Sequence, residues 1–456
     1  METTSMNLLE RFNRWLSESI MVKLASIGFL ILILLIPSAW IESLIRERES
    51  RADSVVEEVA SKWSGPQTVN GPVLIIPFVE HYEVEVEKKT EVRDRIEKAH
   101  FLPEKLEING TVNPQVLHRG IFDAAVYESI INLNATFNVS DFAKMKVADA
   151  DILWSEAEIA IGIKDLRGIS DNPVLLVGGK ECTGEPSSTL EFVAMRNNDY
   201  NISGTGVIVK LPWKSADDFR ADVSMKLPLK GSSSLYFSPV GKTTDVKLSG
   251  PWADPSFEGE FLPATRTVSD QGFSATWKVL HYNRPFAQSW IGSEKSLTGS
   301  DFGARLLIPV DQYQKSMRSS KYGVLVIMLT FVALFMVEII KKIRIHPFQY
   351  ILIGAALIIY YSLLLSFSEQ VSYNWAYFIA TVATVSLISL YSTTFLKSKM
   401  LVLTFTLLLA FFYGFIFVII QLQDFSLLLG SIGLFLIVGV IMYFSRGIKW
   451  YKEVVG

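Results

Sequence analysis

The sequence has a single cysteine, Cys182, among its 456 residues. One thiol cannot form an intramolecular disulfide, and it excludes a zinc site built from several cysteines. Basic residues are not in excess either, since the formal net charge is -3 and the pI is about 6.1. Proteins that bind nucleic acid usually carry a basic patch or a basic excess. The sequence therefore predicts no disulfide scaffold and no nucleic-acid partner.

Motifs for catalysis or for cofactors are also missing. There is no Gly-x-Ser-x-Gly elbow and no phosphate-binding glycine loop, and Asp301-Phe302-Gly303 matches a kinase magnesium motif without the other kinase elements. Four histidines in the central part of the chain lack the spacing of a metal-ligand pair: His81, His100, His118 and His281. We therefore expect no metal, no cofactor and no enzymatic activity.

Long apolar runs, by contrast, fill the last third of the chain. Five runs are 19 to 22 residues long: Tyr322–Ile340, Phe348–Phe367, Trp375–Leu396, Met400–Ile420 and Phe425–Phe444. A bilayer core of about 30 Å needs roughly 20 helical residues, and a helix satisfies its backbone polar groups internally. Residues 322–444 are therefore predicted to form a transmembrane bundle of five helices with short connections.

A further apolar run near the N-terminus predicts a sixth membrane helix over 24–44, after a cytoplasmic segment 1–23. Leu24–Ile41 has 18 residues without a charge. A cleaved signal peptide is the alternative, since Pro37-Ser38-Ala39 resembles a cleavage site, but the proline and the length of the run favour an uncleaved anchor. Apolar residues then recur at helical spacing as far as Trp63, which predicts an amphipathic stalk helix over 45–66.

The middle of the chain, residues 67–321, has the pattern of a water-soluble β domain. Apolar and polar residues alternate in several short segments, which is typical of strands with one buried face: 82–86, 159–163, 223–227 and 273–279. Asn109-Gly110 predicts a hairpin turn, 140–147 a short helix, and 311–321 a polar connection. The predicted fold class is thus a membrane protein with a six-helix α-helical bundle and a large extracytoplasmic, mainly antiparallel β domain.

Charges in the short loops predict the orientation of the bundle. Eight Lys and Arg residues occupy alternate loops and the tail: Lys341, Lys342, Arg344, Lys397, Lys399, Arg446, Lys449 and Lys452. The intervening loops, 368–374 and 421–424, have none. Both termini, including the tail 445–456, are therefore expected in the cytoplasm, with residues 45–321 in the periplasm. Six basic residues beside the predicted β domain oppose this orientation, but the rule discounts long translocated segments: Arg46, Arg48, Arg51, Lys315, Arg318 and Lys321.

No apolar run carries a charge near its centre, which argues against a proton- or ion-coupled transporter. Glu338 lies near the end of its run, and an interfacial ion pair with Lys341 and Lys342 is favoured over a proton relay. The remaining candidate bundle or interface residues are two carboxylates at outer helix ends and three polar side chains in the second run of the last third: Glu369, Asp424, Gln349, Tyr360 and Tyr361.

Motifs along the whole chain resemble the CreD family of bacterial inner-membrane proteins. The resemblance rests on segments in family order: Gly71–Pro77, Arg119–Phe122, Trp252 with Pro255–Gly259, Phe261–Pro263, Asp311–Lys315, His346–Tyr350, Ile388–Tyr391, Leu429–Ser431 and Lys449–Tyr451. Gln423 departs from the family pattern, in which an acidic residue is expected. The resemblance implies a role in cell-envelope integrity, colicin tolerance and β-lactam resistance as the effector of a two-component system, and it carries over no catalytic residue.

Two functions are consistent with these features. The first is a non-enzymatic protein whose β domain contacts a periplasmic or cell-wall partner, while the bundle contacts the lipid bilayer and anchors the domain or passes on a conformational signal. The alternative is a lipid- or envelope-glycan-handling transporter or enzyme, because the bundle is larger than anchoring requires. The sequence sets neither the oligomeric state nor the ligand.

Overall fold

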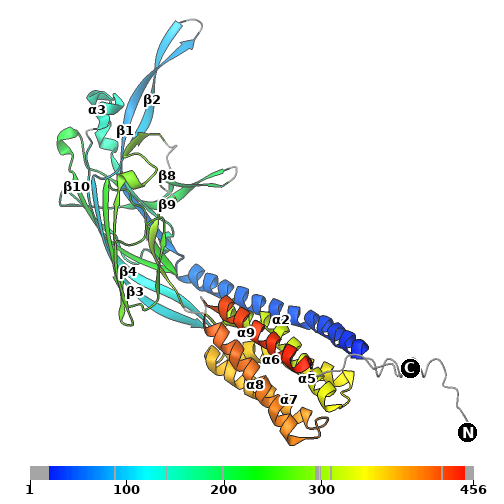
Figure 1. Cartoon of the computed structure of the whole chain (residues 1–456). Helices are drawn as coiled ribbons and strands as arrows, with labels where there is room; N and C mark the ends of the chain where they lie inside the picture. The colour runs from blue at the N-terminus through cyan, green and yellow to red at the C-terminus, as the bar shows by residue number, and fades with distance from the viewer. Residues whose placement is uncertain are drawn as a thin grey trace, which may run out of the picture. The chain divides into compact units, whose positions relative to one another are not determined.

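A computed structural model describes residues 20–86, 89–139, 141–197, 200–292, 297, 299–308, 311–422 and 425–446 (Figure 1). The chain divides into two compact units: a helical unit, Met1–Arg51 with Val310–Gly456, and a β unit, Ala52–Pro309. Helix α2, Ile20–Trp63, is a single helix of 44 residues that contributes to both units.

The remaining long helices all belong to the helical unit: α4 Asp311–Lys321, α5 Gly323–Lys341, α6 Pro347–Ser368, α7 Tyr373–Ser392, α8 Lys399–Gln421 and α9 Ser426–Ser445. Within the described residues, five helices are long and apolar enough to cross a membrane. They are α2, α4 with α5, α6, α7 and α8, while the stretch Leu428–Val440 of α9 is a shorter apolar helix. A bundle of apolar helices is therefore confirmed, with five candidate membrane helices.

Helix α2 packs on the other helices through a narrow stripe. Ile27, Leu34, Ser38 and Ile45 are its buried residues in the helical unit, and they recur at intervals of seven, four and seven residues. This spacing returns to the same side of a helix. At Gly354 of α6, a Cβ atom would collide with the side chain of Leu34. The glycine therefore permits α2 and α6 to approach closely.

Residues 311–321 form helix α4, so the prediction of a polar connection was incomplete. Four side chains of α4 are buried against the bundle: Tyr313, Ser316, Ser319 and Ser320. Serine is polar, so the buried face of this helix is not visible as a pattern of hydrophobic residues. Small hydroxyl side chains are nevertheless suited to close packing between helices.

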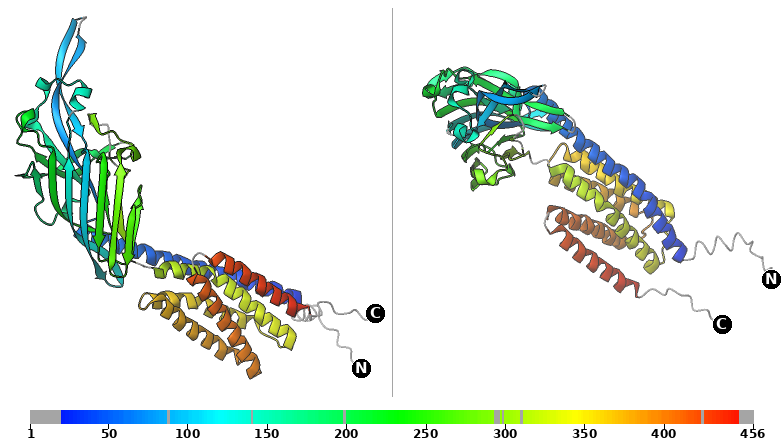
Figure 2. Two further views of the ribbon diagram at one scale, coloured as in Figure 1. Left: turned by 60° about the vertical axis from the view of Figure 1, so that its left-hand side comes forward. Right: turned by 90° about the horizontal axis from the view of Figure 1, so that it is seen from above.

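The β unit contains two sheets. One has nine strands: β1 Gln67–Val86, β2 Lys89–Phe101, β5 Glu158–Ile163, β8 Glu185–Asn197, β9 Tyr200–Lys210, β11 Ser234–Phe237, β13 Pro255–Gly259, β16 Ser289–Ile291 and β17 Phe302–Leu306. The other has eight: β3 Lys105–Arg119, β4 Phe122–Thr136, β6 Val174–Val177, β7 Lys180–Cys182, β10 Asp222–Ser232, β12 Thr243–Gly250, β14 Thr265–Ser269 and β15 Gly272–Leu280. Figure 2 shows both sheets from two further directions.

Among the described strands most pairs are antiparallel, as predicted, and two are parallel: β1 with β11 and β3 with β12. The sheets share one core, to which both contribute fully buried side chains, among them Phe101, Phe237 and Phe302 from the nine-stranded sheet and Tyr127 and Trp277 from the other. This is the arrangement of two packed sheets. Short helical segments lie between strands: α3 Asp141–Met145, η1 Asp149–Asp151, η2 Trp154–Glu156, η3 Leu166–Gly168, η4 Ala216–Asp218 and η5 His281–Asn283.

The hairpin predicted at Asn109-Gly110 was wrong. Both residues lie inside β3 and pair with Asn132 and Ile131 of β4. The turn comes ten residues later, at Gly120, which has a φ of 64°. Gly110 serves packing instead, because a Cβ atom there would lie 2.8 Å from the side chain of Leu248. Gly110 is needed because strands pack closely there, and in the sequence it cannot be told from a glycine needed for a turn.

Strands β1 and β2 continue beyond the nine-stranded sheet as a two-stranded arm, pairing from Val79 with Ile96 to Val86 with Lys89 (Figure 1). The alternation in 82–86 was predicted to bury one face, but Tyr82 is 37% exposed. On the opposite face of the arm, Val92 and Ile96 are 64% and 68% exposed. A two-stranded ribbon is only marginally stable alone, so an arm with exposed aliphatic residues is a candidate contact surface.

Candidate functional site

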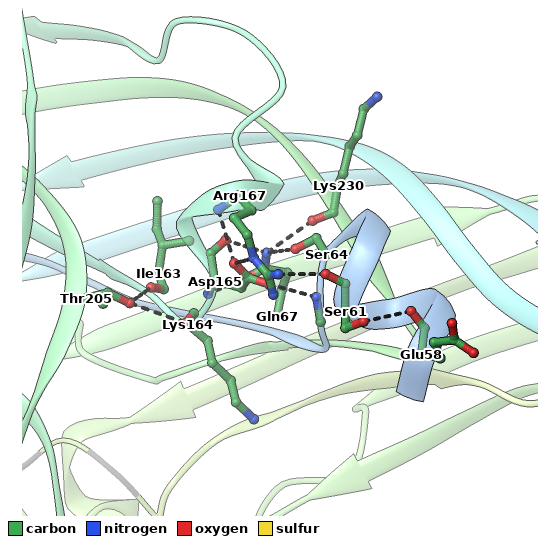
Figure 3. A network of polar contacts seen from close by, with 11 residues as sticks. Glu58, Ser61, Ser64, Gln67, Ile163, Lys164, Asp165, Arg167, Thr205 and Lys230 are labelled. Carbon is green, nitrogen blue, oxygen red and sulfur yellow. Dashed lines mark hydrogen bonds and ion pairs between the residues drawn. The ribbon is translucent and has the colours of Figure 1, made fainter. Parts of the chain in front are cut away.

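A polar network joins the C-terminal end of α2 to the first strand of the β unit (Figure 3). Its centre is the carboxylate of Asp165. One oxygen accepts hydrogen bonds from Gly65 N at 2.9 Å and Arg167 Nη2 at 2.7 Å. The other accepts from Arg167 N at 3.1 Å and Arg167 Nε at 2.9 Å. The hydrogen bonds from Arg167, and then that from Gly65, hold the pKa of Asp165 well below its usual range.

Arg167 connects the network to helix α2. Its Nη1 atom donates to the backbone oxygen of Ser61, in the last turn of α2, at 2.6 Å. This oxygen is one of the carbonyls that the end of a helix leaves without an intrahelical partner. Asp165 and Arg167 therefore act together as a clamp, because one binds the chain after the helix and the other binds the helix end itself (Figure 3).

Gln67 connects the clamp to the sheets. Its Nε2 atom donates to Ser64 Oγ at 2.9 Å, to Asp165 O at 2.8 Å and to Lys230 O at 3.1 Å. Its Oε1 atom accepts from Asp165 N at 3.2 Å. The side chain is fully buried, and a buried amide must satisfy its hydrogen-bonding groups. Gln67 does so only when the helix end, β1 and β10 keep their present positions.

Gly168 makes room for this arrangement. A Cβ atom at this position would overlap Gln67 Nε2 and the backbone oxygen of Lys230. We expect Gly168→Ala to destabilise the β unit by about 1–3 kcal/mol, since the backbone must shift or the hydrogen bonds of Gln67 must break. Thermal unfolding followed by tryptophan fluorescence measures the change.

Gly65→Ala is the matched control for this substitution. Gly65 lies in the same network, but a Cβ atom there would lie 3.6 Å from Asp165 Oδ2, an ordinary contact distance. The control should unfold within about 0.5 kcal/mol of the parent. Equal effects of the two substitutions would contradict the packing argument.

Outside the clamp, two more contacts fix the last turns of α2. Glu58 forms an ion pair with Arg119 of β3 at 2.7 Å, and Lys230 Nζ lies 4.7 Å from the centre of the Trp63 ring. The final part of α2, Ala52–Trp63, is thus held by two strands of the eight-stranded sheet and by the loop that contains η3. Sequence reasoning missed this site, because Asp165 and Arg167 are separated by only one residue in a short loop and match no motif.

In the helical unit, Glu338 is almost completely buried, with a side chain 5% exposed. Its ion pair is with Lys23 of α2, at 2.6 Å, and not with Lys341 or Lys342 of its own helix as the spacing predicted. Tyr350 OH donates to its other oxygen at 3.3 Å. Helix α5 ends directly after Lys341, where Lys342 adopts a left-handed conformation with φ of 53°. The carboxylate therefore joins α2, α5 and α6.

Glu369, at the opposite end of α6, forms a second inter-helix contact. Arg48 Nε of α2 lies 4.0 Å from its Oε1 atom, and Tyr313 OH of α4 donates to the same atom at 3.3 Å. Gln349 has a local role, because its Oε1 atom accepts from His346 N at 3.0 Å and so caps the start of α6. Asp424 lies outside the described residues.

Tyr360 and Tyr361 point into the bundle, where both are buried. They belong to a cluster of tyrosines in ring contact that also includes Tyr373, Tyr377 and Tyr413. Tyr377 OH donates to the backbone oxygen of Tyr413 at 2.7 Å. The Tyr413 hydroxyl is buried and has no hydrogen-bond partner among the described residues. The structure thus brings together the two predicted tyrosines, and it keeps them apart from the two carboxylate sites at the ends of α6.

His81 and His100 of the β unit lie in different environments. His81 Nδ1 lies 2.6 Å from Asp94, and hydrogen bonds to Asp94 and then Asp151 raise its pKa. His100 is buried and stacked on Trp290, and burial lowers its pKa to about 4. The described residues contain no group of three or more side chains suited to a metal ion.

Ser238 and Asp301 form a buried hydroxyl–carboxylate pair among the described residues of the β unit. The Ser238 hydroxyl contacts the carboxylate of Asp301 and the side-chain oxygen of Asn70, and burial raises the pKa of Asp301. No histidine is among these hydrogen-bond partners, so the set lacks the base that activates a serine. The contacts link the end of β11 to β1 and are explained by packing.

A shallow hollow of about 310 Å³ lies on the outer face of the eight-stranded sheet. Its lining includes Glu107 of β3, Asn134 and Thr136 of β4, and Asp222 and Ser224 of β10. These side chains offer hydrogen-bond donors and acceptors, and Thr136 already donates to Asp222 at 3.1 Å. The hollow is suited to a hydrated, polar ligand.

The family model described as "Inner membrane protein CreD" matches residues 19–451. The inner membrane protein CreD of Escherichia coli (strain K12) is 33% identical over 440 residues, which cover 94% of this chain and 93% of that protein.

Among solved structures, a substrate-bound M1 zinc metallopeptidase from Deinococcus radiodurans matches 39% of each chain with 12% identity and a TM-score of 0.18. A likeness at this level says nothing about fold or activity. The sequence matches, by contrast, span the helices and the sheets alike, and they agree with the resemblance seen in the motifs. This chain belongs to the family of the inner membrane protein CreD.

Proposed function

We propose that this inner-membrane protein supports cell-envelope integrity by binding, through its β unit, a periplasmic or cell-wall partner. In this proposal the helices anchor the unit and pass a conformational signal. The protein acts in envelope stress as the effector of a two-component system, and colicin tolerance and β-lactam resistance follow from that role. Binding is preferred to catalysis because neither hydroxyl–carboxylate pair, Ser238 with Asp301 or Thr136 with Asp222, has a histidine among its hydrogen-bond partners in the described residues.

The proposed topology has six membrane helices, with α9 as the sixth and both termini in the cytoplasm. Loop charges support it, since Lys341 ends α5, Lys342 and Arg344 follow it, and Lys397 precedes α8. The connection between α6 and α7, Glu369–Ser372, has no basic residue. Under the positive-inside rule this alternation supports a periplasmic location for the β unit.

The observation that carries the proposal is the dual role of α2. Its last turns are clamped by Asp165 and Arg167 in the β unit, and its other end is paired through Lys23 with Glu338 in the helical unit. A helix held at both ends by charged groups can report a displacement at one end to the other. An anchor alone would need neither contact.

Photo-crosslinking in intact cells tests the partner. A photoreactive amino acid at Ile96 probes the arm, and one at Asn134 probes the hollow. We expect one of these positions to give a discrete crosslinked product outside the cytoplasm. The same residue at Tyr282, which is 84% exposed, is the control for random collision. Equal yields at all three positions, or no product at either test position, would contradict the proposal.

The alternative, handling of a lipid or an envelope glycan by the bundle, has one observation in its favour. The Tyr413 hydroxyl and Thr384 Oγ1 are buried without a hydrogen-bond partner among the described residues, and such groups can accept a polar ligand. If Glu338→Gln and Glu369→Gln variants complement a deletion strain fully while truncations in the β unit do not, the transporter form of this alternative fails.

A further inference from the structure

Helix α4 has two opposite faces of different chemistry. At 100° per residue, the buried side chains Tyr313, Ser316, Ser319 and Ser320 occupy one side of the helix. Lys315, Arg318 and Lys321 recur every three residues and fall within about 120° of arc on the other side. We call these three residues the cationic face of α4. The packing of the serine side against the bundle fixes the direction in which the cationic face points.

The depth of this face follows from the length of α5. Helix α5 has 19 residues, so it is about 28 Å long, close to the bilayer core of about 30 Å. Lys321 lies two positions before the start of α5, and Arg318 lies one turn further out. Both side chains are therefore at the level of lipid phosphate groups, whichever leaflet this end of the bundle occupies. Long basic side chains extend readily to that level.

Two residues of the cationic face, Arg318 and Lys321, have no acidic partner among the described residues. On α2, the arginines at the same end of the bundle alternate with glutamates, and Arg46 and Arg48 lie within ion-pair distance of Glu42 and Glu369. The only acidic residue of α4 is Asp311, in its first turn. Within the described part of the chain, neither Arg318 nor Lys321 pairs with a carboxylate.

We propose that the cationic face of α4 binds the phosphate groups of anionic phospholipids. The guanidinium of Arg318 can hold a phosphate through two hydrogen bonds, and the ammonium of Lys321 supplies a second charge one turn closer to the acyl chains. Lys315, whose Nζ atom lies 5.9 Å from the centre of the Tyr373 ring, adds a third positive charge. Binding there orients α4 relative to the bilayer. The proposal needs membrane insertion but does not depend on the proposed orientation or partner.

Lipid retention by the full-length protein tests the proposal. The protein is equilibrated at low ionic strength in micelles containing phosphatidylglycerol and phosphatidylcholine with identical acyl chains, and the bound lipids are counted by native mass spectrometry. We expect phosphatidylglycerol to be retained preferentially. Arg318→Gln with Lys321→Gln should weaken that preference by about fivefold for each charge removed, whereas Arg318→Lys should keep most of it.

The control variant, Lys226→Gln with Lys278→Gln, removes the same net charge from exposed positions of the β unit. It should retain phosphatidylglycerol as the parent does. Equal retention of the two lipids by the parent, a preference that survives in the α4 double variant, or an equal loss in the control would each overturn the proposal. Displacement of the lipid by inorganic phosphate or by an acidic peptide at equal concentration would assign the face to a soluble anion or to a protein.

Discussion

Asp165→Ala should lower the free energy of unfolding of the β unit by about 3 kcal/mol. Its carboxylate accepts four hydrogen bonds, three of them from Arg167 and one from Gly65. Bonds to a charged group contribute about 1.5–3 kcal/mol each when they are well formed, and those in one network are not additive. Denaturant unfolding of the full-length protein in detergent, followed by tryptophan fluorescence, measures the change.

Asp171→Ala is the matched control for Asp165→Ala. Asp171 is exposed, and its Oδ1 atom accepts a hydrogen bond from Asn172 N at 2.8 Å. The control should shift the free energy of unfolding by no more than about 0.5 kcal/mol. If both variants unfold alike, the clamp does not stabilise the end of α2, and the proposed transmission along this helix loses its basis.

The same carboxylate makes the stability of the β unit depend on pH. Its pKa in the folded protein lies below the ordinary value of 3.8, chiefly because of Arg167. A lowered folded pKa means that the unfolded chain binds the proton more tightly, so the contribution is complete above about pH 5 and is lost as pH falls below 3.8. The difference in unfolding free energy between the parent and Asp165→Ala should therefore shrink between pH 5 and pH 3. A constant difference would contradict the assigned cause.

The periodicity of apolar residues predicted most of the fold, because each strand or helix that buries one face repeats apolar residues at its own spacing. Val223, Met225 and Leu227 alternate with polar residues in β10, and all three are buried. The apolar runs likewise became helices with nearly the predicted limits, because a long run of apolar residues has few ways to bury its backbone polar groups. The exceptions have a common origin. Gly110 and the serines of α4 are small residues selected for close contact, which a hydrophobic pattern does not record.

The candidate site was less predictable, because it depends on pairs of residues distant in the sequence. Glu338 was identified as an ionisable group in an apolar run, but its partner, Lys23, lies 315 residues away. Both residues stand at the ends of their apolar runs, and that shared position was the available signal. Gln67 and Asp165 gave no signal in the sequence. Their mutual hydrogen bonds form only when the strands assemble around the end of α2.

Lys23→Met should destabilise the helical unit by about 3–5 kcal/mol. The side chain of Glu338 is 5% exposed and that of Lys23 is 32% exposed. Removal of the lysine leaves a buried carboxylate with only two long hydrogen bonds, from Tyr350 at 3.3 Å and from Ile345 N at 3.4 Å. A buried charge that has lost its partner carries this cost. Arg46→Met, in an exposed ion pair of the same helix, is the control and should change stability by less than about 1 kcal/mol.

Because the two partners differ in burial, the reciprocal substitution should be milder. Glu338→Gln leaves Lys23 with access to solvent, and the amide can still accept from Tyr350, so we expect no more than about half the effect of Lys23→Met. The double variant Lys23→Met with Glu338→Gln should be more stable than Lys23→Met alone, since it contains no unpaired charge. Thermal unfolding in detergent of the parent, the two single variants and the double variant gives a double-mutant cycle for this pair. A double variant whose loss equals the sum of the single losses would show that the two side chains do not interact, and α2 would then lack its contact with α5.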